Sequence, residues 1–236
     1  SKEIDLGFFA ECWPDQGVKM TISQETLPSL AKGVIYLHEK GFNVSCNLAF
    51  DIGWDADRAR GVLSKQLEIL SEYYIDHPET KPCSMLDYKV TGVLYDNEEF
   101  DKWCGAGESM RFYSVEGEHY ACQFFQPLSV GGELAEACSI DFEDRDSLID
   151  PMCRDCPFLT ICPTCYGANY AANGDPARKS RHECELNKVV ILANSWFRFR
   201  QLESLSDEEL GIDGAERRRL IEAVVAIQEN WMRMGS

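Results

Sequence analysis

The stretch that decides the fold class is VKMTISQETLPSLAKGVIYLHEKGFNVSCNLAF, residues 18–50. Its two ends, residues 18–22 and 44–50, are apolar and alternating, which indicates β-strands. Between them, apolar residues recur at the spacing of one helix face, at Leu27, Leu30, Val34 and Leu37. Ser23 stands where an N-cap belongs and Gly41 where a helix stops. A strand, a helix and a second strand in this order predict parallel pairing.

A second amphipathic helix is expected downstream, marked by Leu63, Leu67, Leu70 and Tyr74 and ended by Pro78. The order βαβα is typical of doubly wound sheets and of (β/α) barrels, but two units are too few to close either. Residues 1–99 therefore predict an α/β fold made of incomplete (β/α) barrel units, with one further short strand over 88–95. Together with the start at Ser1 instead of a methionine, this leads us to expect the C-terminal part of a longer protein.

The rest of the chain is predicted to form a small cysteine-rich module, residues 100–190, and C-terminal helices, residues 191–236. Within the module, residues 111–122 indicate a β-hairpin that turns at Glu116-Gly117. The last helix carries one apolar stripe, Leu220, Val224, Ile227, Trp231 and Met234. We expect this stripe to pack in the core; a docking surface for a partner helix is the alternative.

Composition excludes some classes of protein. A net charge of −17 argues against a nucleic-acid partner, which would need clustered Lys and Arg, but it permits a basic peptide partner. No apolar run reaches the ~18 residues of a membrane span, and the first residues do not form a secretory signal. We therefore expect no membrane partner and a cytoplasmic location.

Eleven cysteines in 236 residues require an explanation. The cytosol keeps thiols reduced, so dense cysteines there serve metals or redox chemistry more often than disulfides. Four of them form the run Cys153-x2-Cys156-x5-Cys162-x2-Cys165. Two successive CxxC pairs indicate a metal site, but zinc and iron–sulfur clusters both take four thiolates, so this spacing does not choose between them. Cys12 and Cys46 are expected to be small buried apolar residues.

The whole cysteine pattern resembles the motif of the SPASM domain: Cys-x(9–15)-Gly-x4-Cys, then Cys-x2-Cys-x5-Cys-x3-Cys, then one distant cysteine. The matching positions are Cys104, Gly117, Cys122, Cys153, Cys156, Cys162, Cys165 and Cys184. The chain departs from the motif in having two residues instead of three between Cys162 and Cys165. The region upstream resembles the last units of the partial barrel that precedes SPASM domains in radical SAM enzymes.

The resemblance implies two auxiliary [4Fe–4S] clusters. Cluster I would be held by Cys104, Cys122 and Cys165, and cluster II by Cys153, Cys156, Cys162 and Cys184. Some relatives supply a fourth ligand to cluster I from a cysteine just before the motif, where residues 98–101 here are Glu, Glu, Phe and Asp. We therefore expect either an open iron on cluster I or a remoter ligand, Cys83 or Cys138.

The resemblance also implies an activity. Radical SAM enzymes cleave S-adenosylmethionine at a third [4Fe–4S] cluster held by Cys-x3-Cys-x2-Cys, and no such triplet occurs among Cys12, Cys46 and Cys83. The chain is thus expected to be the auxiliary-cluster part of an enzyme that modifies a ribosomally made peptide, for example by a crosslink. Its clusters would transfer electrons or bind substrate. Its partners would be the peptide, with a basic leader, and the missing N-terminal half of the barrel.

Other interpretations remain open from the sequence. Sulfatase-maturing relatives have an acidic base after the second SPASM cysteine, and Gln123 in that position counts against their activity. A catalytically incomplete electron carrier or peptide-binding scaffold is one alternative, and a structural zinc protein is another.

Overall fold

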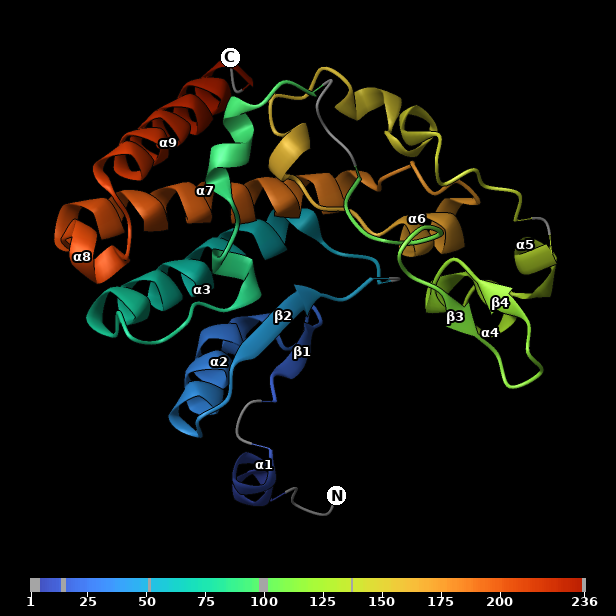
Figure 1. Cartoon of the computed structure of the whole chain (residues 1–236), viewed down its shortest axis with the longest axis horizontal. Coiled ribbons are helices and arrows are strands. Elements are labelled where there is room, and N and C mark those ends of the chain that lie inside the picture. The colour runs from blue at the N-terminus through green and yellow to red at the C-terminus, as the bar shows by residue number, and fades with distance from the viewer. Residues whose placement is uncertain (1–4, 14–15, 51, 98–101, 137, 235–236) are drawn as a thin grey trace. The chain divides into compact units, whose positions relative to one another are not determined.

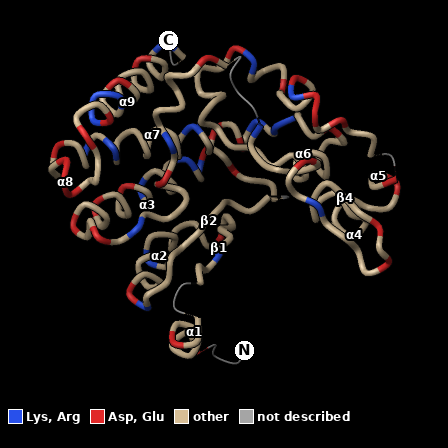
Figure 2. The backbone as a smooth tube through the Cα atoms, viewed as in Figure 1, with Lys and Arg blue, Asp and Glu red and all other residues tan. Residues whose placement is uncertain are grey.

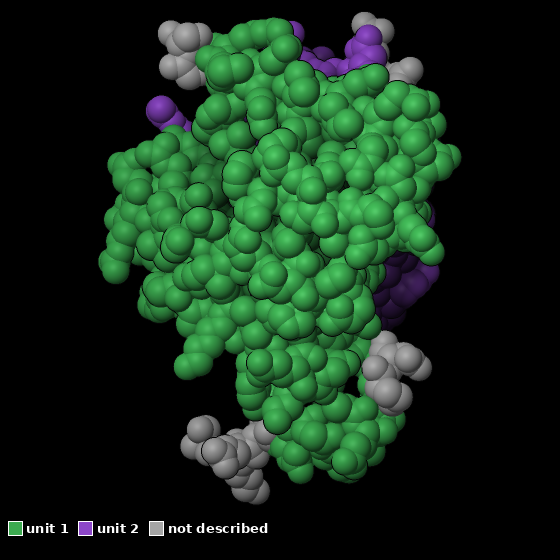
Figure 3. Space-filling view, turned by 90° about the vertical axis from the view of Figure 1, so that its left-hand side faces the viewer, with its two compact units in different colours: residues 1–94, 185–236 green, residues 95–184 purple. Residues whose placement is uncertain are grey.

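The computed structural model describes residues 5–13, 16–50, 52–97, 102–136 and 138–234 (Figure 1). These residues form a mixed α/β structure that is mostly helical, and its strands close no barrel. The chain divides into two compact units, which Figure 3 shows in separate colours. Unit 1 comprises residues 1–94 and 185–236, and unit 2 comprises residues 95–184. The C-terminal helices thus belong to the same unit as the N-terminal strands.

The elements up to residue 94 are α1 (Leu6–Cys12), β1 (Val18–Ile22), η1 (Leu27–Ser29), α2 (Leu30–Glu39), β2 (Val44–Leu48), α3 (Ala56–Asp76), η2 (Ser84–Leu86) and η3 (Val90–Leu94). Residues 95–184 contain β3 (Phe112–Tyr113), β4 (His119–Tyr120), η5 (Gln123–Phe125), α4 (Pro127–Val130), α5 (Gly132–Glu136), η6 (Arg145–Leu148), η7 (Pro151–Cys153), η8 (Leu159–Ile161) and α6 (Tyr166–Asn173). The last helices are α7 (Arg181–Ser204), α8 (Asp207–Leu210) and α9 (Gly214–Met234).

The predicted parallel strands are confirmed. β1 pairs with β2 in parallel, with Val18 opposite Val44 and Ile22 opposite Leu48. The expected helices follow each strand, as α2 and α3, and their apolar faces form the core of unit 1. The side chains of this core that are fully shielded from solvent are Leu30, Val34, Leu63, Leu67 and Leu70. Fully burying one such side chain stabilises the fold by about 1.5–3 kcal/mol.

The outer edge of β2 is closed by a serine side chain. The Ser84 hydroxyl accepts the Cys46 N–H at 2.8 Å and donates to the Cys46 carbonyl at 2.7 Å. Because backbone groups alternate in direction along a strand, these are the groups that a further strand would pair with. On β1, the outward backbone groups are those of Lys19 and Thr21, by the same alternation.

The strand predicted over residues 88–95 is wrong, because this segment forms the 3₁₀ helix η3. Its alternating apolar residues suggested a strand, but its backbone groups are bonded locally and to a side chain. Val90 N–H donates to the Tyr88 carbonyl and Gly92 N–H to the Lys89 carbonyl, both at 2.9 Å. The Tyr88 N–H donates to the Asn194 side chain on α7, also at 2.9 Å.

The apolar stripe of the last helix packs in the core along only part of its length. Val224 and Ile227 on α9 are buried, which confirms the expected core role for this part, and α9 packs against η3. Trp231 and Met234, in the last turns, are 37% and 39% exposed. They line a hollow in unit 1 instead of its core.

Unit 2 has little regular structure. The predicted hairpin is confirmed as the antiparallel pair β3 and β4, with Phe112 opposite Tyr120. Gly117 lies in the turn with φ +90°, a backbone conformation that favours glycine. The core of this unit is aromatic and includes Phe125, Phe142, Tyr166 and Tyr170. It brings together segments that carry several of the cysteines.

Candidate metal centre

Three cysteines of unit 2, Cys104, Cys122 and Cys165, are neighbours, and we call them the first thiol set. Cys122 directly precedes η5, and Cys165 is the N-cap residue of α6. Burial, with smaller contributions from the Cys122 and Cys104 thiols, raises the pKa of the Cys165 thiol to about 11. Burial and then the Cys104 thiol also raise the pKa of Cys122. Each thiol therefore lies within electrostatic range of the other two.

The residues beside the first thiol set explain why distant segments meet there. The N–H of Trp103, just before Cys104, donates to the Tyr166 hydroxyl at 3.1 Å, and Tyr166 follows Cys165. The next residue, Gly167, packs so closely on the Phe124 side chain that any Cβ at this position would collide with it. The loop of Cys104 and the start of α6 are thus joined directly.

The second thiol set comprises Cys153, Cys156 and Cys162, on a segment of short 3₁₀ turns. Cys153 ends η7, and the Cys156 N–H donates to the Cys153 carbonyl at 3.1 Å. Cys162 is the C-cap of η8. Burial is the largest cause that raises the pKa of the Cys153 thiol to about 11, and the Cys162 and Cys156 thiols raise it as well. These three thiols are therefore also neighbours.

A lysine is buried beside the second thiol set. Lys179 is only 9% exposed, and its ammonium donates to the Cys162 Sγ at 3.2 Å, to the Cys162 carbonyl at 3.3 Å and to the Pro163 carbonyl at 2.9 Å. Its backbone N–H donates to the Asp150 carboxylate at 3.0 Å. The other oxygen of this carboxylate accepts the Met152 N–H at 2.9 Å. Asp150 thereby ties the lysine's backbone to the turn that carries Cys153.

Cys184, the last cysteine of the motif, lies in the first turn of α7. Its N–H donates to the Ser180 carbonyl at 3.2 Å. Lys179 interacts electrostatically with both the Cys162 thiol and the Glu183 carboxyl group, which is next to Cys184 in sequence. The turn that carries Cys184 therefore begins close to the second thiol set.

The two cysteines expected as remoter ligands of cluster I have different surroundings. Cys138 packs on the same unit 2 core as Cys104 and Cys122, and it interacts with the Tyr170 side chain. Cys83 belongs to unit 1, where it is fully buried. Residues 98–101, where some relatives have a ligand, lie outside the described residues.

Cys83 is engaged with Cys46 in the core of unit 1. The hydrogen bond with the Cys83 thiol, followed by burial, raises the pKa of Cys46 far above its usual range. The Cys83 N–H donates to the Tyr74 hydroxyl at 2.9 Å. The expected burial of Cys46 is confirmed, whereas that of Cys12 is wrong. Cys12 is exposed because it ends α1, a helix with no buried residue.

Among the described residues, no three His, Cys, Asp or Glu side chains are grouped closely enough to hold a single metal ion. The donor chemistry nevertheless fits an iron–sulfur cluster, because each set supplies several neighbouring thiols. The three cysteines of each set, and Cys184, would be the residues that hold such a group.

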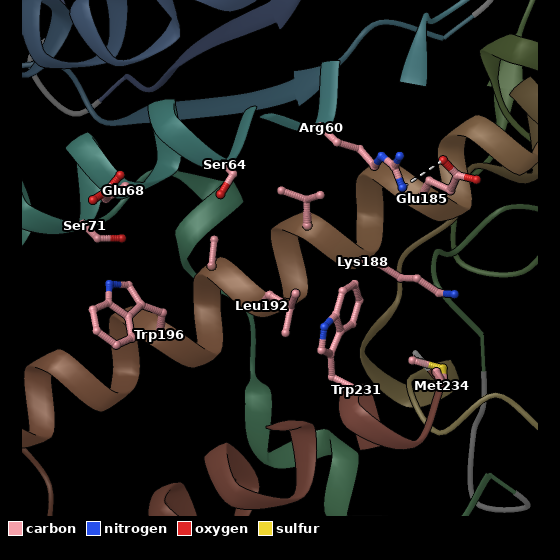
Figure 4. Close-up of a pocket in the computed structure, with 12 residues that line it drawn as sticks. Arg60, Ser64, Glu68, Ser71, Glu185, Lys188, Leu192, Trp196, Trp231 and Met234 are labelled. Atoms are coloured by element: carbon pink, nitrogen blue, oxygen red, sulfur yellow. Dashed lines mark ion pairs between the residues drawn. The ribbon is translucent and has the colours of Figure 1, made fainter. Parts of the chain in front are cut away.

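A separate hollow lies in unit 1 and is shown in Figure 4. It has a volume of about 650 Å³ and lies between α3, α7 and α9. Trp196 and Trp231 line it, and an ion pair of 3.6 Å joins Arg60 to Glu185 at its edge. Its lining contains no cysteine, so it is distinct from both thiol sets.

Acidic side chains outnumber basic ones and are spread over both units (Figure 2). Among the described residues, no helix is both long and apolar enough to cross a membrane.

Lys179 and Asp150 were not among the residues expected from the sequence. A signal for the lysine was present, since the basic run Arg178-Lys179-Ser180-Arg181 ends three residues before the last motif cysteine in an acidic chain. Nothing in the sequence marked Asp150 among the other carboxylates.

The chain matches no protein-family model, no curated protein and no solved structure.

Proposed function

We propose that residues 104–184 bind two [4Fe–4S] clusters. The observation that carries this proposal is that the cysteines of unit 2 form two separate thiol sets. Cys104 and Cys122 come from one part of the cysteine pattern and Cys165 from another, yet their thiols influence one another's pKa values. This is the division of cysteines that the resemblance to the SPASM domain implies.

Burial in both sets has a consequence for cluster binding. Because the pKa values of Cys153 and Cys165 are raised to about 11, their thiols are protonated at neutral pH without metal. Iron–sulfur clusters bind thiolates, so binding releases these protons and is favoured as the pH rises. The same partial burial reduces the exposure of these sulfurs to solvent, which is one of the factors that set the potential of a cluster.

In the complete enzyme, the clusters would serve radical modification of a ribosomally made peptide. They would supply electron transfer away from a substrate radical, or a binding site for the substrate. S-adenosylmethionine and the third cluster would be bound by the barrel half that carries Cys-x3-Cys-x2-Cys. The net charge of −17 supports a peptide partner with a basic leader, because opposite charges increase the rate of association.

The metal content of the chain tests this proposal. Purified without oxygen, the wild-type chain is expected to be brown and to contain about eight irons if both sites fill with [4Fe–4S] clusters. Iron and acid-labile sulfide are quantified together with zinc in the same sample. Colourless protein with stoichiometric zinc and no iron would instead support the structural zinc protein.

A second prediction concerns the fourth ligand of cluster I. Cys138 shares a core with Cys104 and Cys122, whereas the Cys83 thiol is hydrogen-bonded to Cys46 within unit 1. We therefore propose Cys138 as this ligand, and we expect Cys138→Ser to lose cluster I, about four irons, because serine binds iron more weakly than a thiolate. Iron analysis and electron paramagnetic resonance (EPR) spectroscopy measure this loss.

Cys83→Ser is the matched control and should keep the iron content of the wild type. Unchanged iron in both variants would leave the open iron as the better account of cluster I. A loss in Cys83→Ser alone would contradict the assignment of Cys138.

A further inference from the structure

The buried ammonium of Lys179 is a fixed positive charge in direct contact with a motif cysteine. Its three hydrogen bonds, to the Cys162 sulfur, the Cys162 carbonyl and the Pro163 carbonyl, orient it toward the second thiol set. At 9% exposure it has little contact with water. A charge in such a place is weakly screened, whereas an exposed charge is screened by solvent and salt.

The surroundings of Lys179 hold it in this position. Asp150 accepts the Lys179 backbone N–H and is itself only 9% exposed. The Glu183 carboxyl group, directly before Cys184 in sequence, also interacts with the ammonium. The lysine is thus fixed at both its backbone and its ammonium group.

We infer that Lys179 is a positioning residue that raises the reduction potential of the cluster bound by the second thiol set and Cys184. The inference rests on the proposed function, since it requires a cluster at this site. Reduction adds one electron and makes a thiolate-ligated cluster more negative. A positive charge beside a ligand sulfur stabilises that reduced state, and hydrogen bonds to the sulfurs act in the same direction. Lys179 therefore favours electron uptake by cluster II over cluster I.

The test measures the midpoint potentials of both clusters in the full chain by redox titration followed by EPR spectroscopy. Two neutral variants are compared so that a folding defect in one does not prevent the measurement. Lys179→Gln keeps N–H donors, and Lys179→Met keeps the apolar stem. Lys179→Arg retains the charge. Arg178→Gln is the matched control, because it removes the same charge from an exposed neighbour.

Both neutral variants are expected to shift one midpoint potential to a more negative value and to leave the other unchanged. Lys179→Arg should stay closer to the wild type than either, and Arg178→Gln should not differ from it. Iron-loaded neutral variants with wild-type potentials would overturn the inference. An equal shift in Arg178→Gln would also overturn it, because the effect would then come from net charge.

A second measurement needs neither a variant nor a cluster. Amine acetylation of the wild-type chain, followed by mass spectrometry, should label Lys179 much more slowly than Lys65, whose side chain is 64% exposed. Equal labelling would show that Lys179 is not buried and would overturn the inference. Wild-type protein without iron would overturn both the proposed function and the inference, whereas unchanged potentials in iron-loaded variants would overturn the inference alone.

Discussion

Replacing Cys165 or Cys153 by serine is expected to remove about half of the bound iron in each case. Cys165 belongs to the first thiol set and Cys153 to the second, and each is a partly buried member of its set. Serine preserves the size of the side chain but binds iron more weakly than a thiolate. Each variant should therefore lose one cluster of about four irons and keep the other, and the double variant should lose both.

Iron and sulfide analysis of anaerobically purified protein measures this effect, and circular dichroism checks that the fold is retained. Cys12→Ser is the control, since Cys12 is exposed on α1 and far in sequence from the motif. If either single variant lost all iron, the two sets would not be independent sites. If both kept all iron, the assignment of ligands would be contradicted.

Replacing Asn194 by alanine is expected to destabilise unit 1 by about 3 kcal/mol or more, since three backbone groups lose a hydrogen-bond partner. The Asn194 side chain is fully buried on α7, where its oxygen accepts the Tyr88 N–H and its nitrogen donates to the Met85 carbonyl at 2.7 Å. A second bond of 2.8 Å from the same nitrogen reaches the Val190 carbonyl. Alanine leaves these backbone groups without their partner, and each buried unsatisfied group costs about 1–3 kcal/mol.

Urea unfolding followed by far-ultraviolet circular dichroism measures the change in the free energy of unfolding. Asn230→Ala is the control, since Asn230 is half-buried on α9 and the substitution is the same. Its effect should stay within about 0.5 kcal/mol. Equal destabilisation by the two variants would show that the bonds of Asn194 are not the cause.

The fold could be predicted where local periodicity and tertiary packing agree. Residues 18–22 alternate in sequence and do pair with β2, because an apolar face there covers the core. Residues 88–95 show similar alternation, but the Asn194 side chain takes the Tyr88 N–H, and the segment coils into η3. The partner is more than a hundred residues away, so no local pattern could reveal it.

The candidate site shows the same limit. The spacing identified the cysteines of the motif as a group, because the two thiols of a CxxC pair are close enough in sequence to bind one metal centre. It could not show that the ammonium of Lys179 lies on the Cys162 sulfur, since this contact depends on how the chain folds between the two residues. Nor could the spacing show that the Cys83 thiol is hydrogen-bonded to the Cys46 thiol, because those cysteines come from separate elements of unit 1.

The side chain of Ser84 makes the two edges of the small sheet unequal. The Ser84 hydroxyl accepts from the Cys46 N–H and donates to the Cys46 carbonyl. A further strand that paired with β2 would therefore have to break these two hydrogen bonds. Ser84 thus hinders the addition of a further strand beside β2. On β1, only the lysine of the Lys19 and Thr21 pair offers the charged protection that natural sheet edges use. A further strand would therefore add more readily beside β1 than beside β2.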